Sequence, residues 1–237
     1  MIGVSDPGFG PMKEEYANFY SQRNPARVYP VEFVVRTFLG TYPGLKLDRT
    51  TYQGARILDL GFGDGRNMPL LHDLGFEICG VEISDDICDL TRSRMQRLGV
   101  PAQLEKGTNS HIPFGDGAFD FVLACHACFY VDPGETFADN LREIARVLQP
   151  GGRFIFSLAK VDTYLLEGAV DLGSGHYRIT QDPYGLRNGG VFRAFASRDE
   201  IVDGLGAFFC DFSLGLCEND FYGIYEKVWI GTCLRKS

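Results

Sequence analysis

The sequence predicts an α/β protein built as a single domain of 237 residues. The first observation is a short apolar run, residues 55–60, which is typical of a buried parallel strand. The second is the turn after it, where glycines stand at alternate positions before a helical segment. The third is the alternation of later strand-like runs with amphipathic helical patterns. These runs are residues 76–81, 102–106, 119–124 and 153–158.

Composition and charge argue against several functional classes. The net charge is −8 at pH 7, so we expect no nucleic-acid partner, because phosphate binding needs a basic surface. No run of 18 apolar residues predicts a membrane span. The N-terminus also lacks the basic and apolar segments of a secretory signal. With 45% hydrophobic content, a chain of this length can bury one ample core.

The seven cysteines are an odd set scattered through apolar segments. This pattern indicates reduced thiols and a cytoplasmic location rather than a disulfide framework. Cys125 and Cys128 have a Cys-x-x-Cys spacing, but no second ligand pair accompanies them. We therefore expect no metal site, and both side chains are assigned to the core or to a pocket lining.

The glycine-rich turn after the first strand is the candidate ligand site. Its spacing is Asp59-x-Gly61-x-Gly63-x-Gly65. A dinucleotide fingerprint would need glycine where Arg66 stands, and a P-loop would need a Gly-Lys-Ser/Thr sequence, which is absent. Glycine allows the backbone angles of a strand that turns at once into a helix, and it leaves room for a ligand. Asp59 stands at the carboxyl end of the strand, where open α/β sheets bind their ligands.

A second carboxylate, Glu82, follows the second strand and lies 21 residues beyond Gly61. At this distance an acidic residue typically accepts hydrogen bonds from both hydroxyls of a ribose. A lone glutamate is usually solvated surface. The position of Glu82 at a strand end, with the expected spacing, favours the ligand-binding interpretation.

The glycine turn resembles the first motif of the class I S-adenosylmethionine-dependent methyltransferases. Residues 107–114, GTNSHIPF, resemble the family segment that meets the adenine ring, and residues 141–152, LREIARVLQPGG, closely resemble the pattern before the fifth strand. The three segments occur in the family's order and cover residues 54–158. The resemblance implies a seven-stranded Rossmann-like sheet of order 3-2-1-4-5-7-6, with one antiparallel strand and helices on both faces.

The remaining segments are assigned around this core, within one methyltransferase domain over residues 1–237. Residues 13–40 are predicted to form two helices, which either pack on the sheet or cover the cofactor pocket with Tyr16 and Tyr20. Residues 160–196 contain glycines and aromatics without clear periodicity, and they are too long for a plain connector. We interpret them as an inserted cap, followed by a C-terminal helix and strand pair over residues 197–235.

The resemblance implies S-adenosylmethionine as the cofactor and assigns residues to it. Thr108 stands where the family has an aspartate that accepts from the adenine amino group, so Thr108 or Asn109 must supply a weaker hydrogen bond. The cofactor-binding candidates are Asp59, Gly61, Phe62, Gly63, Gly65, Asn67, Glu82, Ile83, Thr108, Asn109, Ser110, Cys125, Tyr16 and Tyr20. The substrate candidates are Tyr20, His126, Tyr130, His176, Tyr177 and Arg178.

We expect methyl transfer to a small molecule, with the accepting atom (nitrogen, oxygen, carbon or sulfur) open. His126 and His176 are the catalytic candidates, because histidine can orient a hydroxyl or amine and titrates near neutral pH. The alternative is that His126 is packed at a strand end and His176 lies in an exposed loop. Two other functions are weighed: an NAD(P)-dependent oxidoreductase, which Arg66 argues against, and a non-catalytic protein that binds S-adenosylmethionine or S-adenosylhomocysteine. A homodimer is left open.

Overall fold

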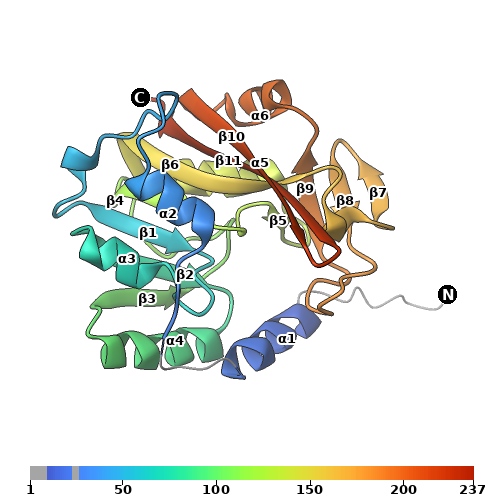
Figure 1. Cartoon of the computed structure of the whole chain (residues 1–237), viewed down its shortest axis with the longest axis horizontal. Coiled ribbons are helices and arrows are strands. Elements are labelled where there is room, and N and C mark those ends of the chain that lie inside the picture. Colours follow the sequence, from blue (N-terminus) through green and yellow to red (C-terminus); the bar gives the residue numbers. More distant parts are fainter. Residues whose placement is uncertain (1–9, 23–26) are drawn as a thin grey trace.

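The computed structural model describes residues 10–22 and 27–237, arranged as a twisted central sheet with helices on both sides (Figure 1). The α-helices are α1 (Gly10–Ser21), α2 (Glu32–Leu39), α3 (Met68–Asp73), α4 (Asp85–Leu98), α5 (Phe137–Val147) and α6 (Arg198–Leu205), with 3-10 turns η1 (Arg49–Thr51) and η2 (Tyr164–Leu166). The strands are β1 (Arg56–Leu60), β2 (Glu77–Glu82), β3 (Ala102–Lys106), β4 (Phe119–Ala124), β5 (Tyr130–Val131), β6 (Leu148–Lys160), β7 (Val170–Gly173), β8 (His176–Arg178), β9 (Val191–Phe195), β10 (Phe209–Phe221) and β11 (Ile224–Arg235).

The main sheet runs β3-β2-β1-β4-β6-β11-β10. Strands β3, β2, β1, β4 and β6 run parallel to one another. β11 is antiparallel to both β6 and β10. The predicted order 3-2-1-4-5-7-6 with one antiparallel strand is therefore confirmed, since β6, β11 and β10 are its fifth, seventh and sixth strands.

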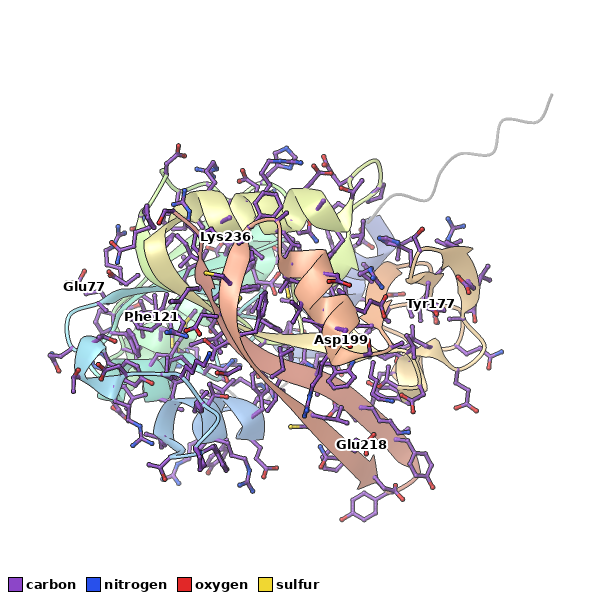
Figure 2. All side chains as sticks on the ribbon, turned by 90° about the horizontal axis from the view of Figure 1, so that it is seen from above. Glu77, Phe121, Tyr177, Asp199, Glu218 and Lys236 are labelled. Carbon is purple, nitrogen blue, oxygen red and sulfur yellow. The ribbon has the colours of Figure 1, made fainter. Side chains whose placement is uncertain are left out.

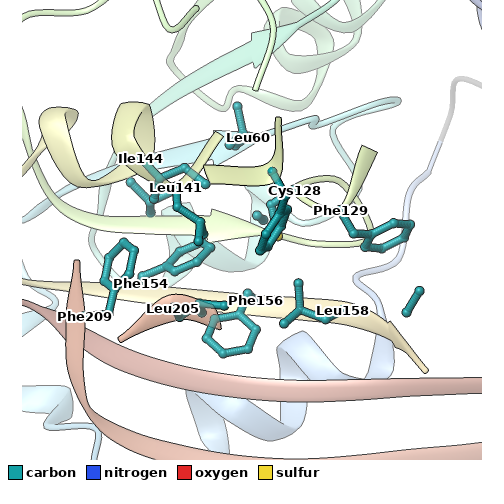
Figure 3. Packing of buried hydrophobic residues seen from close by; sticks show 14 of the residues in the cluster. Leu60, Cys128, Phe129, Leu141, Ile144, Phe154, Phe156, Leu158, Leu205 and Phe209 are labelled. Carbon is teal, nitrogen blue, oxygen red and sulfur yellow. The ribbon is translucent and has the colours of Figure 1, made fainter. Parts of the chain in front are cut away.

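Successive residues of the central strands enter different cores, as the period-2 geometry of a strand requires. Ile57 of β1 packs with α2, α3 and α4, while Leu58 packs with α5 and α6 on the opposite face. In β6, Ile155 joins the first core, and Phe154 and Phe156 join the second. Figure 3 shows part of this second core. Because both faces are covered, the ligand surface is left at the carboxyl edge of the strands.

The inserted segment forms more regular structure than its sequence indicates. β7, β8 and β9 make a small antiparallel sheet, and β5 adds to β9. β9 joins the main sheet through two residue pairs at the end of β6, Ala159 with Ala194 and Lys160 with Phe195. The apolar–polar alternation in these strands is only three to five residues long, which explains why no period was visible.

The fifth helix begins later than its sequence signals indicate. Asp132, Pro133 and Gly134 are typical of a helix start, yet α5 begins at Phe137 with Thr136 as its cap. Thr136 and Asp139 form a capping box. Gly134 has φ +84°, in the left-handed region, so the chain before Thr136 turns instead of forming a helix. The Asp132 side chain is consequently free to face the cavity described below.

The two N-terminal helices have different positions. α1 lies beside the open edge of the sheet, whereas α2 buries Phe33, Val34 and Phe38 against the sheet. Of the predicted lid over residues 13–40, α1 is thus the part at the site, and residues 23–26 lie outside the described residues.

All seven cysteines are free thiols, with Cys128 in the core and Cys125 at the cavity. No group of three or more metal-ligating side chains that could hold an ion occurs within residues 10–22 and 27–237. Among those same residues, none of the helices has the length and apolar character needed to cross a membrane.

Candidate active site

A cavity of about 350 Å³ opens at the carboxyl edge of the central strands. It lies between the glycine turn, α1, the segment after β4, η2 and the inserted segment. The predicted site residues that line it are Tyr16, Tyr20, Gly61, Phe62, Asn67, Glu82, Ile83, Thr108, Asn109, Cys125, His126 and Tyr130. The predicted residues outside its lining are Asp59, Gly63, Gly65, Ser110, His176, Tyr177 and Arg178.

Glu82 closes the glycine turn onto the end of β2. Its Oε1 accepts a hydrogen bond from the Gly63 amide at 3.1 Å, and its Oε2 accepts one from the Ile83 amide at 2.6 Å. Burial raises the pKa of this carboxyl, and the two backbone donors work in the opposite direction. A carboxylate held in this way retains lone pairs that face the cavity, which suits it to accept from two neighbouring hydroxyls.

Asp59 lies directly beneath the turn and is fully buried. Within the described residues, neither of its carboxyl oxygens has a hydrogen-bond partner. Burial raises the pKa of Asp59 to about 7, and the charges of Glu82 and Asp64 add to this effect. A buried polar group without a partner is costly. This orphaned carboxyl beneath a glycine turn fits a ligand with hydrogen-bond donors or positive charge, as expected for the amino-acid part of S-adenosylmethionine.

The three glycines of the turn have separate roles, and all have left-handed φ angles. A Cβ on Gly61 would lie 2.4 Å from Cβ of Ala127, so this glycine lets the turn approach the segment after β4. A Cβ on Gly65 would lie 2.7 Å from Cγ2 of Thr91, so Gly65 allows close packing on α4. The structure gives Gly65 this packing role and places it outside the cavity lining.

We expect Gly63→Ala to disturb both the turn and the lid. Gly63 has φ +55°, and an added Cβ would lie 2.4 Å from the Tyr20 hydroxyl. The left-handed backbone alone should lower the free energy of unfolding by about 1 kcal/mol. Urea unfolding and calorimetric titration with S-adenosylhomocysteine would measure the two effects. A variant with unchanged stability and unchanged affinity would contradict this role, and Gly44→Ala is the control, because nothing lies within 4 Å of its Cβ position.

Where residues 107–109 line the cavity, the side chains form a short chain of hydrogen bonds. The Thr108 and Ser110 hydroxyls lie 3.2 Å apart, and Ser110 Oγ donates to Asp132 at 3.1 Å. Asn109 is occupied elsewhere, because its amide donates to the carbonyls of Ala127 and Tyr130. Asp132 also lines the cavity. Its carboxylate brings an acid to the region where Thr108 lacks one.

The lid helix α1 contributes two tyrosines to the cavity. The Tyr16 and Tyr20 rings are stacked, with centroids 6.0 Å apart. The Tyr16 hydroxyl lies 2.6 Å from that of Tyr130. Burial raises the pKa of Tyr16 and of Tyr20, so both phenols are neutral at pH 7. Of the two interpretations of this helix, covering the pocket matches the observed position.

His126 follows β4 and lines the cavity with φ +55°, an uncommon angle for a residue with a side chain. Its amide donates to the Ser157 hydroxyl at 2.8 Å, and its ring meets Phe33 edge-on at 5.8 Å. Burial lowers the pKa of His126 to about 4, with Arg187 and Arg66 contributing. The expectation that this histidine titrates near neutral pH is therefore wrong. A neutral His126 can orient an acceptor but is a weak base.

The other predicted substrate residues lie away from the cavity. His176, Tyr177 and Arg178 form β8, which pairs with β7 on one side and β9 on the other. Figure 2 shows Tyr177 in this small sheet. The insertion does reach the cavity, through residues 163–165 around η2 and through the loop before β9.

That loop supplies Arg187, which the sequence analysis missed. Its Nη1 lies 3.0 and 3.1 Å from the two carboxyl oxygens of Asp182, and its Nε donates to the Tyr130 hydroxyl at 3.3 Å. Asp182 also accepts from three amides of its own loop, so it fixes the loop and the arginine together. Tyr164, Tyr184 and Glu226 complete this end of the cavity. In the sequence, the feature that could have identified Arg187 is an acidic residue, Asp182, five positions before it.

Fold and site together define an α/β protein with a cavity beside a glycine turn and an acidic residue, Glu82. The comparisons with known proteins bear on its class. Residues 58–156 match the model of the methyltransferase domain family. This stretch, which runs from β1 into β6, is therefore similar to a methyltransferase domain.

Individual relatives agree with this assignment. An uncharacterized methyltransferase of Mycobacterium tuberculosis is 35% identical over 114 residues, which are 48% of this chain and 44% of that protein. The chain thus spans about half the length of the first curated relatives that it matches. The fold resembles crystal structures of a Pyrococcus horikoshii protein (TM-score 0.66, 20% identity, 92% and 99% of the two chains) and of a methyltransferase from Methanosarcina mazei (TM-score 0.64, 20%, 83% and 98%).

Proposed function

We propose that this protein transfers the methyl group of S-adenosylmethionine to a small-molecule acceptor. The observation that carries the proposal is one continuous cavity with two differently built ends. One end contains the glycine turn and Glu82, and the other contains His126, Arg187 and Glu226. Donor and acceptor can therefore meet inside a single cavity, which lowers the barrier by orienting them.

The protein's own part in this reaction is to bind and orient. Bound S-adenosylmethionine supplies a methyl group that its sulfonium charge has already activated, so no covalent nucleophile is required. Glu82 and the glycine turn hold the nucleoside, and Asp59 lies buried beneath that turn. Tyr16 and Tyr20 cover the site, and aromatic faces favour a neighbouring cation. The acidic overall charge supports a metabolite rather than a nucleic acid as the acceptor.

The direct test is transfer of a labelled methyl group to components of a small-molecule extract, with S-adenosylhomocysteine measured as the second product. Formation of both products would exclude a protein that only binds the cofactor. Consumption of a nicotinamide cofactor without methyl transfer would favour an oxidoreductase instead.

We expect His126→Ala to lower turnover by about tenfold or more while the affinity for S-adenosylhomocysteine stays unchanged. The reason is that a neutral ring at the end of β4 can orient the acceptor without contacting the nucleoside. Steady-state rates and calorimetry separate the two effects. His72→Ala, an exposed position on α3, is the control. An unchanged rate would assign His126 to packing against Phe33.

A further inference from the structure

The acceptor end of the cavity contains an acidic side chain from the last strand, Glu226. Glu226 and Val228 stand two residues apart, which places them on one face of β11, and both line the cavity. Val228 is the first β11 residue that pairs with β6, opposite Ala159. Glu226 thus lies just past the paired region, at the carboxyl end of β6, on the edge of the sheet where α/β proteins bind ligands.

The Glu226 carboxylate is half-buried, and no residue in the described part of the chain forms a hydrogen bond or ion pair with it. Burial raises its pKa, and the charge of Arg187 acts against this. Arg187 is not its partner, because the guanidinium is paired with Asp182 and hydrogen-bonded to Tyr130 and Tyr164. A partly desolvated carboxylate of this kind is stabilised by a ligand that donates a hydrogen bond or carries a positive charge.

The charges around Glu226 point to a cationic ligand. Arg187 and Asp182 form a pair without net charge, and His126 is neutral at pH 7 because its pKa is about 4. Glu226 therefore leaves this end of the cavity with one uncompensated negative charge. Tyrosine rings line the same cavity, and their faces attract cations. They are Tyr16, Tyr20, Tyr130, Tyr164 and Tyr184.

We propose that the methyl acceptor is an amine, and that Glu226 binds its N–H group and accepts its proton. This inference rests on the proposed methyltransferase function. An ammonium group at Glu226 gives one proton to the carboxylate, which frees the nitrogen lone pair. That pair forms the bond to the methyl carbon, and the carbon–sulfur bond breaks with its electrons remaining on sulfur. The products are the methylated ammonium and S-adenosylhomocysteine, and the proton leaves Glu226 to water.

Binding of a simple probe tests the site without requiring the natural acceptor. Benzylamine, which is protonated at pH 7.5, and benzyl alcohol have the same ring and differ in the group offered to Glu226. We expect the protein loaded with S-adenosylhomocysteine to bind benzylamine about tenfold more tightly than benzyl alcohol, as a charge-assisted hydrogen bond implies. Glu226→Gln should bring this ratio close to one. The control is Glu218→Gln, because Glu218 is exposed on the same hairpin and outside the cavity (Figure 2).

Each outcome decides the proposal. A ratio near one in the unmodified protein, or no measurable binding of either probe, would overturn it. An equal loss of preference in Glu218→Gln would show that the hairpin, not the site, is responsible. If Glu226→Gln weakens S-adenosylhomocysteine instead, Glu226 belongs to the cofactor. Failure to bind S-adenosylhomocysteine at all would remove the methyltransferase proposal, and the probe ratio measured without it would still report on Glu226.

In turnover assays, the same proposal predicts that acetylating the amines of an extract abolishes methyl transfer. Label that still enters the acetylated extract would identify an acceptor other than a primary or secondary amine, the amines that carry the N–H group assigned to Glu226. That result would contradict the amine assignment while supporting methyl transfer itself.

Discussion

We expect Glu82→Ala to weaken the binding of S-adenosylhomocysteine by roughly 10- to 150-fold, which corresponds to about 1.5–3 kcal/mol for hydrogen bonds to a charged group. The variant removes the carboxylate from the cavity and also frees two amides, those of Gly63 and Ile83, that it accepts from. The glycine turn should then lose its closed geometry. Both losses act on the cofactor, so the affinity change should reach the upper part of this range.

Calorimetry on the folded variant measures the effect. Glu77→Ala is the matched control, because Glu77 stands at the opposite end of β2 and is exposed (Figure 2). Glu82→Gln keeps the shape of the side chain and should retain part of the affinity, since an amide oxygen still accepts. Unchanged affinity in Glu82→Ala would remove this residue from the nucleoside site.

The strands of the sheet were predictable because each is marked by a pattern of residues that are close together in the sequence. Ile57 and Leu58 enter opposite cores through strand geometry alone, and the Asp59-to-Gly65 spacing marks the end of β1. The same local reasoning found Glu82, whose spacing from the turn depends on one strand–helix–strand unit. The overall strand order came from resemblance to a family and not from the residues themselves.

The acceptor end was not predictable in this way because it is assembled from distant segments. Arg187, Tyr164 and Glu226 meet there only after the insertion folds and β11 pairs with β6. His176 and Arg178 carried suitable chemistry but point elsewhere, since β8 is an inner strand of the small sheet. Asp132 was misassigned because a helix-start signature and an irregular turn share the same residues, and the capping box at Thr136 determined where the helix begins.

The buried carboxyl of Asp59 should lower the free energy of unfolding of the protein in a pH-dependent way. Asp59 has a pKa of about 7 in the folded protein, against 3.8 in water. Well below pH 3.8 this group is neutral in both states and carries no penalty. As the pH rises from 4 to 7, the unfolded chain ionises first, so the folded state becomes progressively less favoured, and the full penalty is present above pH 7. The difference of about three pH units corresponds to about 4 kcal/mol.

We therefore expect Asp59→Asn to stabilise the cofactor-free protein by up to about 4 kcal/mol at pH 8 and to change its stability little at pH 4. The amide keeps the shape of the side chain and removes the charge that burial, Glu82 and Asp64 oppose. Urea unfolding at pH 4, 6 and 8 measures the gain, with Asp73→Asn, an exposed position on α3, as the control. A gain independent of pH, or a loss at pH 8, would contradict the raised pKa. If Asp59 contacts the amino-acid part of the cofactor, the more stable variant should also bind S-adenosylhomocysteine less tightly, because charge that destabilises the empty site stabilises the occupied one.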